Sequence, residues 1–173
     1  EPILTHCELE HVDFVPLNDV NAFNLGNPLA GIVPNGMIFI QSDKTDPAEI
    51  WAGIPHYAKK IIRQKSLRVY VLDTVTIARD VATTADLIQR MQGIVLLGIF
   101  LRVTPFRDSA GLTDEQIFAA VEKSLRKYFG KRGEQVVQDN LTCVRRGFME
   151  VFEIPREVMN GEGAAVEEAT ATA

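Results

Sequence analysis

Small polar side chains follow three short apolar runs of this sequence, and they are its first candidates for a binding site. The candidates are Asn18 and Asp19 after residues 12–17, Gln41 and Ser42 after residues 37–40, and Asp73 after residues 67–72. If the runs are parallel strands, their carboxyl ends meet at one sheet edge, where open α/β sheets bind ligands. The same residue types form turns and cap helices, so capping is the competing interpretation.

Residues that bind metals or act as nucleophiles are few. His6, Cys7 and His11 stand close together near the start, but a metal site needs further ligands and the sequence offers none. Cys7 and Cys143 form no CxxC pair, so we expect no disulfide framework, zinc site or iron–sulfur cluster within the chain. No GxSxG, P-loop or HExxH motif is present. We therefore predict neither a catalytic residue nor a metal ligand here.

The stretch "YFGKRGEQVVQDNLTCVRR", residues 128–146, combines a basic cluster with one unusual polar residue. The cluster consists of Lys127, Lys131, Arg132, Arg145 and Arg146. It is typical of a solvated face, and the alternatives are a surface for an acidic partner or a site for an anion such as phosphate.

Asn140 adjoins a stripe of apolar residues at helical spacing, where a leucine would pack better. We expect the Asn140 amide to be at least partly buried and hydrogen-bonded. Our interpretation is that it ties the hairpin to the segment after Asp73, and the alternative is a contact with a partner or ligand.

The elements that would position these residues predict an α/β fold with a Rossmann-like parallel sheet in three layers and a C-terminal helical hairpin. Asp46-Pro47 and the Thr113–Gln116 capping box start two of the helices, and Gly130 is expected to end one in the left-handed conformation. The predicted strands are 12–17, 37–40 and 67–72, and the predicted helices are 47–64 with a defect at Pro55, 85–102, 114–129 and 134–149. Residues 1–155 are expected to form the domain and residues 156–173 a disordered tail or linker.

Composition narrows the function classes. The chain has 173 residues, 46% of them hydrophobic, and a formal net charge of −5, which argues against a nucleic-acid partner. Its longest apolar run, residues 93–101, is about half of a membrane span. We expect no membrane partner, no signal peptide and a cytoplasmic location.

Three stretches together resemble one protein family. "HVDFVPLND" is similar to its "ADFVIALD"-type strand, "LRVYVLDTVTIARDV" to its "IDAxxIAxE" segment, and "YFGKRGEQVVQDN" to its "FGKKGEEVVEKN" hairpin. They occur in this order in the gamma subunit or domain of 2-oxoacid:ferredoxin oxidoreductases, such as pyruvate synthase. The opening "EPIL" resembles the segment that precedes the first of them. Asn140 falls on the family's asparagine.

The resemblance implies a complex that converts pyruvate or another 2-oxoacid to acyl-CoA and CO2 and passes electrons to ferredoxin. Thiamine diphosphate would be held by alpha and beta subunits, and Mg and [4Fe–4S] clusters would belong to the complex, whose other parts include ferredoxin-like (delta) subunits or domains. This chain would be inactive alone and would supply packing and part of the coenzyme A approach. Asn18, Asp19, Gln41, Ser42, Asp73 and Asn140 are the residues expected to make such contacts.

The chain departs from the family pattern in two places. The family's opening strand with its GxGGQG loop is missing, so we expect the first part of the gamma domain to be absent. Arg90 stands where the family often has asparagine. The alternative functions are an assembly or regulatory module on the same fold, and a nucleotide-binding domain of a different oxidoreductase.

Overall fold

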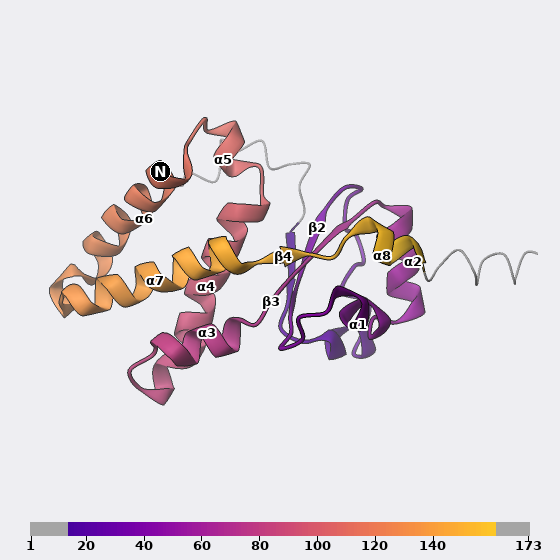
Figure 1. Ribbon diagram of the computed structural model, residues 1–173, viewed down its shortest axis with the longest axis horizontal. Coiled ribbons are helices and arrows are strands. Elements are labelled where there is room, and N and C mark those ends of the chain that lie inside the picture. Colours follow the sequence, from indigo (N-terminus) through magenta and orange to yellow (C-terminus); the bar gives the residue numbers. More distant parts are fainter. Residues whose placement is uncertain (1–13, 162–173) are drawn as a thin grey trace, which may run out of the picture. The chain divides into compact units, whose positions relative to one another are not determined.

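A computed structural model describes residues 14–161 of the chain (Figure 1). By their contacts these residues divide into two compact units, residues 14–71 with 152–161, and residues 72–151. Each unit has its own elements and its own core. Within residues 14–161, every helix falls short of the length or the apolar character that a bilayer crossing demands.

The first unit is built on a sheet with the strand order β1-β2-β3-β4. Its strands are β1 (Phe14–Leu17), β2 (Met37–Gln41), β3 (Arg68–Leu72) and β4 (Phe152–Glu153). β1 and β2 pair in parallel from Phe14↔Met37 to Leu17↔Ile40. At the start of β3, the amide of Arg68 donates to the carbonyl of Gly36, just ahead of β2. The predicted α/β class with a mostly parallel sheet is therefore confirmed.

β4 is an antiparallel addition that the sequence analysis did not predict. It pairs with β3 through Tyr70↔Glu153 and Val71↔Phe152. Arg68 donates from Nε and Nη2 to the two carboxylate oxygens of Glu153 at 2.8 and 2.7 Å. A strand of two residues is too short to show a periodic pattern in the sequence. It is recognised only in the structure, from its pairing with β3.

The helices of the first unit follow from local signals. They are the 3-10 helix η3 (Val20–Asn24), α1 (Pro47–Ala52), α2 (His56–Gln64) and α8 (Arg156–Gly161). Asp46 caps α1 by accepting from the Ala48 amide at 3.1 Å, and the predicted helix 47–64 is broken just before His56, as Pro55 indicated.

Helix α8 corrects the expectation of an irregular tail from residue 156. Met159 of α8 is buried in the same core as Trp51, Ile38 and Val69. This apolar anchor explains why the short segment is helical despite its polar composition. Residues 162–173 lie outside the described part, and the assignment of residues 1–155 to one gamma-type domain stays a prediction.

The second unit is helical. It contains α3 (Thr74–Val81), η4 (Ala85–Leu87), α4 (Ile88–Val103), α5 (Phe106–Ser109), α6 (Asp114–Phe129), η5 (Gly130–Arg132) and α7 (Glu134–Glu150). The predicted helices 85–102, 114–129 and 134–149 are confirmed, and both hydrogen bonds of the Thr113–Gln116 capping box form. Helix α3 was not predicted; it starts directly after β3, with Asp73 as its N-cap.

The turn of the α6–α7 hairpin differs from the expectation. Gly130 keeps a right-handed backbone with φ −56° and begins η5, whereas Gly133 adopts φ 107°. The basic turn therefore continues the helical winding, and the residue that needs a glycine is Gly133.

Helices α4 and α7 cross each other (Figure 1), and two glycines lie at their close approach. A Cβ on Gly98 would lie 2.1 Å from the carbonyl oxygen of Val144, and one on Gly147 would lie 2.2 Å from that of Val95. The backbones are thus in direct contact at the crossing, which sets the relative position of the two helices. Val95, Ile99, Val144 and Phe148 around it are fully buried.

Candidate functional site

The polar residues after β1 and β2 lie at one edge of the sheet, as predicted. Leu17 pairs with Ile40, so Asn18 and Gln41 are the next residues in register. Asn18 and Asp19 are exposed, while Gln41 and Ser42 are half-buried. The sheet therefore brings these four residues to the same end of two neighbouring strands.

Local caps and turns account for three of the predicted site residues. Asp19 is the N-cap of η3 and accepts a hydrogen bond from the Asn21 amide at 3.0 Å, whereas Ser42 Oγ accepts one from the Lys44 amide at 3.1 Å within a turn. Asp73 is the N-cap of α3: it accepts from the Thr76 amide at 3.1 Å and from the Thr76 hydroxyl at 2.6 Å. The interpretation as turn and cap residues is confirmed for these side chains, and ligand contact at the strand ends stays a prediction.

Asn140 is buried, with 3% of its surface exposed. Its Nδ2 donates to the carbonyl oxygen of Val136 at 2.7 Å, one turn back in the same helix. The expectation of a buried, hydrogen-bonded amide is confirmed. The expected tie to the segment after Asp73 is wrong, because the donor is used within α7 itself.

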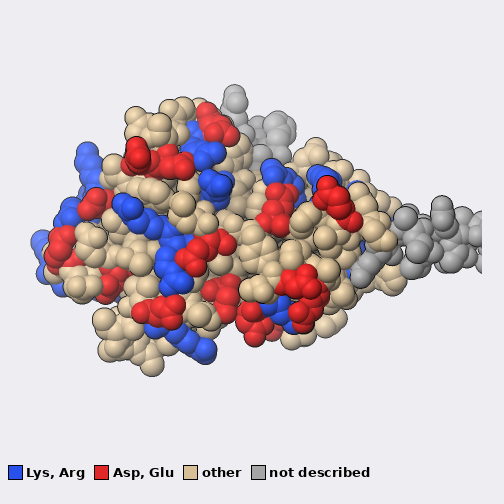
Figure 2. All heavy atoms as spheres, in the orientation of Figure 1, with Lys and Arg blue, Asp and Glu red and all other residues tan. Residues whose placement is uncertain are grey.

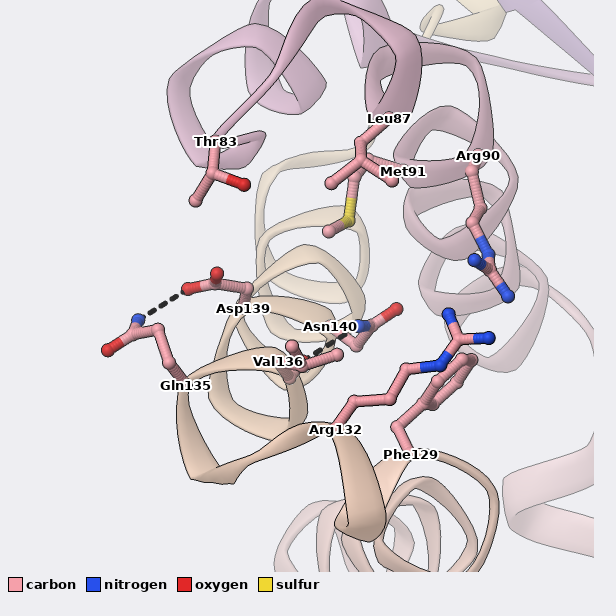
Figure 3. Close-up of a pocket in the computed structure, with 10 residues that line it drawn as sticks. All are labelled: Thr83, Leu87, Arg90, Met91, Phe129, Arg132, Gln135, Val136, Asp139 and Asn140. Carbon is pink, nitrogen blue, oxygen red and sulfur yellow. Dashed lines mark hydrogen bonds between the residues drawn. The ribbon is translucent and has the colours of Figure 1, made fainter.

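Asn140 contributes instead to a pocket of the second unit with a volume of about 150 Å³ (Figure 3). The pocket is lined by residues of η4 and the segment before it, α4, the end of α6, η5 and α7, namely Thr83, Leu87, Arg90, Met91, Phe129, Arg132, Gln135, Val136, Asp139 and Asn140. Of the residues predicted for a site, only Asn140 lies there. The strand-end residues of the first unit and Asp73 do not line it.

Two arginines also line this pocket: Arg90, which was not considered for a site, and Arg132, which belongs to the basic cluster for which an anion site was an alternative. The guanidinium carbon of Arg90 lies 5.2 Å from the centre of the Phe129 ring, and that of Arg132 lies 5.9 Å from the same centre. Both side chains extend toward the Phe129 side of the pocket (Figure 3). Two features of the sequence could have drawn attention to them: Arg90 departs from the family pattern, and Arg132 lies in the basic turn. No spacing in the sequence indicates that these two side chains lie close together.

The basic cluster predicted on the hairpin is divided by the structure. Arg146 forms ion pairs with Asp80 at 3.0 Å and Glu150 at 2.7 Å. Arg145 stacks on Phe118 at 4.9 Å, and only Arg132 lines the pocket. Lys/Arg and Asp/Glu side chains are interspersed over the visible face in Figure 2, in keeping with such pairing. The cluster is thus not one continuous cationic surface.

Cys143 is a free cysteine, but the surroundings of its thiol make it unreactive. It is fully buried, with its Sγ 3.7 Å from Met91 Sδ. Burial raises the pKa of the Cys143 thiol to about 11, and the nearby Asp139 carboxylate acts in the same direction. The thiol therefore stays protonated at neutral pH. His6, Cys7 and His11, considered above for a metal site, lie outside the described residues.

Comparison with known proteins identifies the family. The sequence model of the family described as "Pyruvate ferredoxin/flavodoxin oxidoreductase" matches residues 1–150. The chain belongs to this family. The resemblance on which the sequence analysis relied is therefore confirmed.

Relatives in the pyruvate ferredoxin/flavodoxin oxidoreductase family are much longer than this chain. The pyruvate-flavodoxin oxidoreductase of Trichormus variabilis is 30% identical over 117 residues, which cover 68% of this chain and 9% of the relative. The pyruvate:ferredoxin oxidoreductase of Moorella thermoacetica is 23% identical over 172 residues, which cover 99% of this chain and 14% of the relative. The chain thus spans about a tenth of the length of these curated relatives.

A solved structure shares the fold. The crystal structure of pyruvate oxidoreductase subunit PORC from Thermotoga maritima matches with a TM-score of 0.53 and 20% sequence identity. The match covers 82% of this chain and 65% of that subunit. This match supports the α/β fold described above.

Proposed function

We propose that this chain is the gamma-type part of a 2-oxoacid:ferredoxin or flavodoxin oxidoreductase complex, with pyruvate the leading substrate. In that reaction a 2-oxoacid and coenzyme A give acyl-CoA, CO2, a proton and two electrons, which pass to ferredoxin or flavodoxin. The observation that carries the proposal is the family match over residues 1–150. The fold likeness to the PORC subunit supports it.

The residues of the chain fit a supporting role in this reaction. Within residues 14–161, no three His, Cys, Asp or Glu side chains come together as a metal site would require. The donor set therefore does not fit Mg or [4Fe–4S] clusters in the described residues. The proposal assigns these groups, with thiamine diphosphate, to alpha, beta and ferredoxin-like (delta) subunits or domains, where thiamine diphosphate supplies the carbanion chemistry.

The contribution of this chain would be packing against those partners and part of the coenzyme A approach. Asn18 and Gln41, side by side in register at the strand ends, are our first candidates for polar contacts. Asp19, Ser42 and Asp73 belong to the same proposal, although their oxygens already accept hydrogen bonds within caps and a turn. Asn140 is the candidate in the second unit.

Reconstitution tests the proposal. The chain would be co-expressed with the alpha, beta and delta parts encoded beside it and purified through a tag on this chain. We expect the partners to co-purify and the assembly to reduce a viologen dye with pyruvate and coenzyme A, whereas the chain alone does not.

Two outcomes would contradict this function. Dye reduction by the purified chain alone would show that it carries its own catalytic centre. Equal turnover by an assembly that lacks the chain would favour the alternative of an assembly or regulatory module.

A further inference from the structure

Two cationic side chains of the Asn140 pocket have no acidic partner within the described residues. Three other arginines of the same unit form ion pairs: Arg107 with Asp114, Arg126 with Glu122 and Glu134, and Arg146 with Asp80 and Glu150. With residues 14–161, Arg90 and Arg132 form no such ion pair. A bound anion would neutralise these two neighbouring positive charges.

Phe129 keeps these two arginines on one side of the pocket. Both guanidinium groups lie within 6 Å of its ring centre, at 5.2 and 5.9 Å. Stacking on an aromatic face uses the flat side of a guanidinium and leaves its N–H edge available. Figure 3 shows the two guanidinium groups next to each other above the Phe129 ring. Their donors are thus held ready for a shared acceptor.

The single carboxylate of the pocket does not neutralise them. Asp139 accepts a hydrogen bond from Gln135 Nε2 at 2.7 Å, on the opposite side of the pocket from the arginines (Figure 3). Buried Asn140 lies between, with its Nδ2 held by Val136 and its oxygen turned toward the arginine side (Figure 3). The pocket is therefore polarised, with its cationic end at Arg90, Arg132 and Phe129.

We propose that this cationic end binds a phosphate group, either free or at the end of a phosphorylated organic compound. The N–H donors of two guanidinium groups match the geometry of phosphate oxygens. A phosphate monoester carries a charge of about −2, which would neutralise both arginines. A carboxylate would neutralise only one. The pocket volume of about 150 Å³ is below the usual range for a drug-sized ligand, so it fits a phosphate end rather than a whole nucleotide.

Arg90 and Arg132 supply the two charges of the site, so replacement of either by a neutral residue would remove one of them. The inference goes beyond the proposed function and does not depend on it.

Calorimetric titration of the 173-residue chain at low ionic strength tests the site. The ligands are inorganic phosphate, ADP as an organic phosphate, and adenosine and acetate as comparisons. We expect phosphate and ADP to bind and adenosine and acetate to bind at least tenfold more weakly. Tighter binding of ADP than of phosphate would identify an organic phosphate as the ligand, and the reverse order would identify free phosphate.

Three variants separate the pocket from overall charge. Arg90→Asn and Arg132→Gln should each weaken phosphate binding by about tenfold or more, as expected for loss of a charge-assisted contact. Lys131→Gln is the matched control, because it removes the same charge from the same turn without altering the pocket. All three side chains are exposed, so melting curves should confirm that each variant folds.

The proposal is overturned if the parent chain binds none of the phosphates at millimolar concentration. It is also overturned if Lys131→Gln weakens binding as much as Arg132→Gln, or if adenosine and acetate bind as well as ADP and phosphate. These results leave the proposed function untouched, since that function is decided by assembly and turnover.

Discussion

Asn140 is the residue at which burial, polarity and position in the pocket coincide. Its side chain donates to Val136 O, the carbonyl that already accepts the backbone amide of residue 140 in a regular α-helix. Removing the side-chain amide therefore leaves no backbone group unpaired. The residue is suited to a role toward a ligand or partner, while apolar neighbours such as Val137 and Leu141 supply the packing.

Asn140→Leu should therefore change the free energy of unfolding of the chain by less than about 1 kcal/mol, because only one supplementary hydrogen bond is lost. Urea unfolding followed by circular dichroism measures this. The control is Leu141→Ala, which truncates a buried neighbour and should cost about 2–5 kcal/mol. A loss for Asn140→Leu as large as that of the control would restore a structural role for the amide.

At the scale of elements, the crossing of α4 and α7 depends on two glycines. Gly98 and Gly147 each face a backbone carbonyl of the other helix, Val144 and Val95 respectively. Glycine is unfavourable within a helix, so its presence here reflects the lack of space for a Cβ. These helices also carry Arg90 and Asn140, so the crossing positions the pocket.

Gly98→Ala and Gly147→Ala should each lower the free energy of unfolding by at least about 2 kcal/mol, because rigid backbone must move to admit the methyl group. Gly93→Ala is the matched control, since Gly93 lies in α4 with nothing within 4 Å of the added Cβ. That control should leave stability unchanged or raise it by up to about 1 kcal/mol. Thermal melting of all three variants provides the comparison, and equal effects at positions 93 and 98 would refute the close crossing.

The α6–α7 hairpin is also joined by an ion pair, which predicts a dependence on pH. Arg126 donates to both carboxylate oxygens of Glu134, and this, with a hydrogen bond from Gln138, lowers the pKa of Glu134 from 4.5 to about 2. Because the folded pKa is below the unfolded one, the pair stabilises the fold above pH 4.5 and loses this effect as the pH falls toward 2. Salt should weaken it, since both side chains are solvated.

Arg126→Gln should raise the pKa of Glu134 toward 4.5 and reduce the fall in melting temperature between pH 4.5 and pH 2. An NMR titration of the Glu134 carboxyl carbon measures the pKa directly. Lys123→Gln removes an equal charge from the exposed face of α6 and should leave the titration nearly unchanged. An unshifted Glu134 pKa in Arg126→Gln would contradict the ion pair.

At the scale of the whole molecule, the two compact units differ in how the chain builds them. The second unit is one continuous segment, residues 72–151, whereas the first requires residues from both sides of it. β4 and α8 return to the first unit, where Ile154 donates its amide to Val69 O at 2.8 Å and Met159 enters the core. The first unit is therefore completed only by the end of the described chain.

Residues 72–151 expressed alone should consequently fold, giving a helical circular dichroism spectrum and a cooperative thermal transition. Their core, which includes Val144, Phe148 and Ile117, lies entirely within the segment. A truncation after residue 151 should instead unfold the first unit, seen as loss of the near-ultraviolet signal of buried Trp51. A fragment 72–151 without a cooperative transition would show that the two units depend on each other.

The sequence by itself determined the elements whose signals are local. Capping residues, helical periodicity and the break at Pro55 were enough to predict α1, α2, α4, α6 and α7 close to their observed bounds, because these signals act between residues a few positions apart. Three apolar runs predicted the parallel strands, and the hairpin motif with the two motifs that precede it predicted the family.

The tertiary structure decided the features that depend on residues far apart in the chain. Met91 and Cys143 meet across 52 positions, and the pocket draws Arg90, Arg132 and Asn140 from separate elements. Packing in the folded chain also decided three local features. These are the polar atoms that form cap hydrogen bonds, the glycines that adopt a positive φ, and the pairing of β4 with β3. Such contacts are selected by the shape and burial of the folded chain, and no spacing in the sequence encodes them alone.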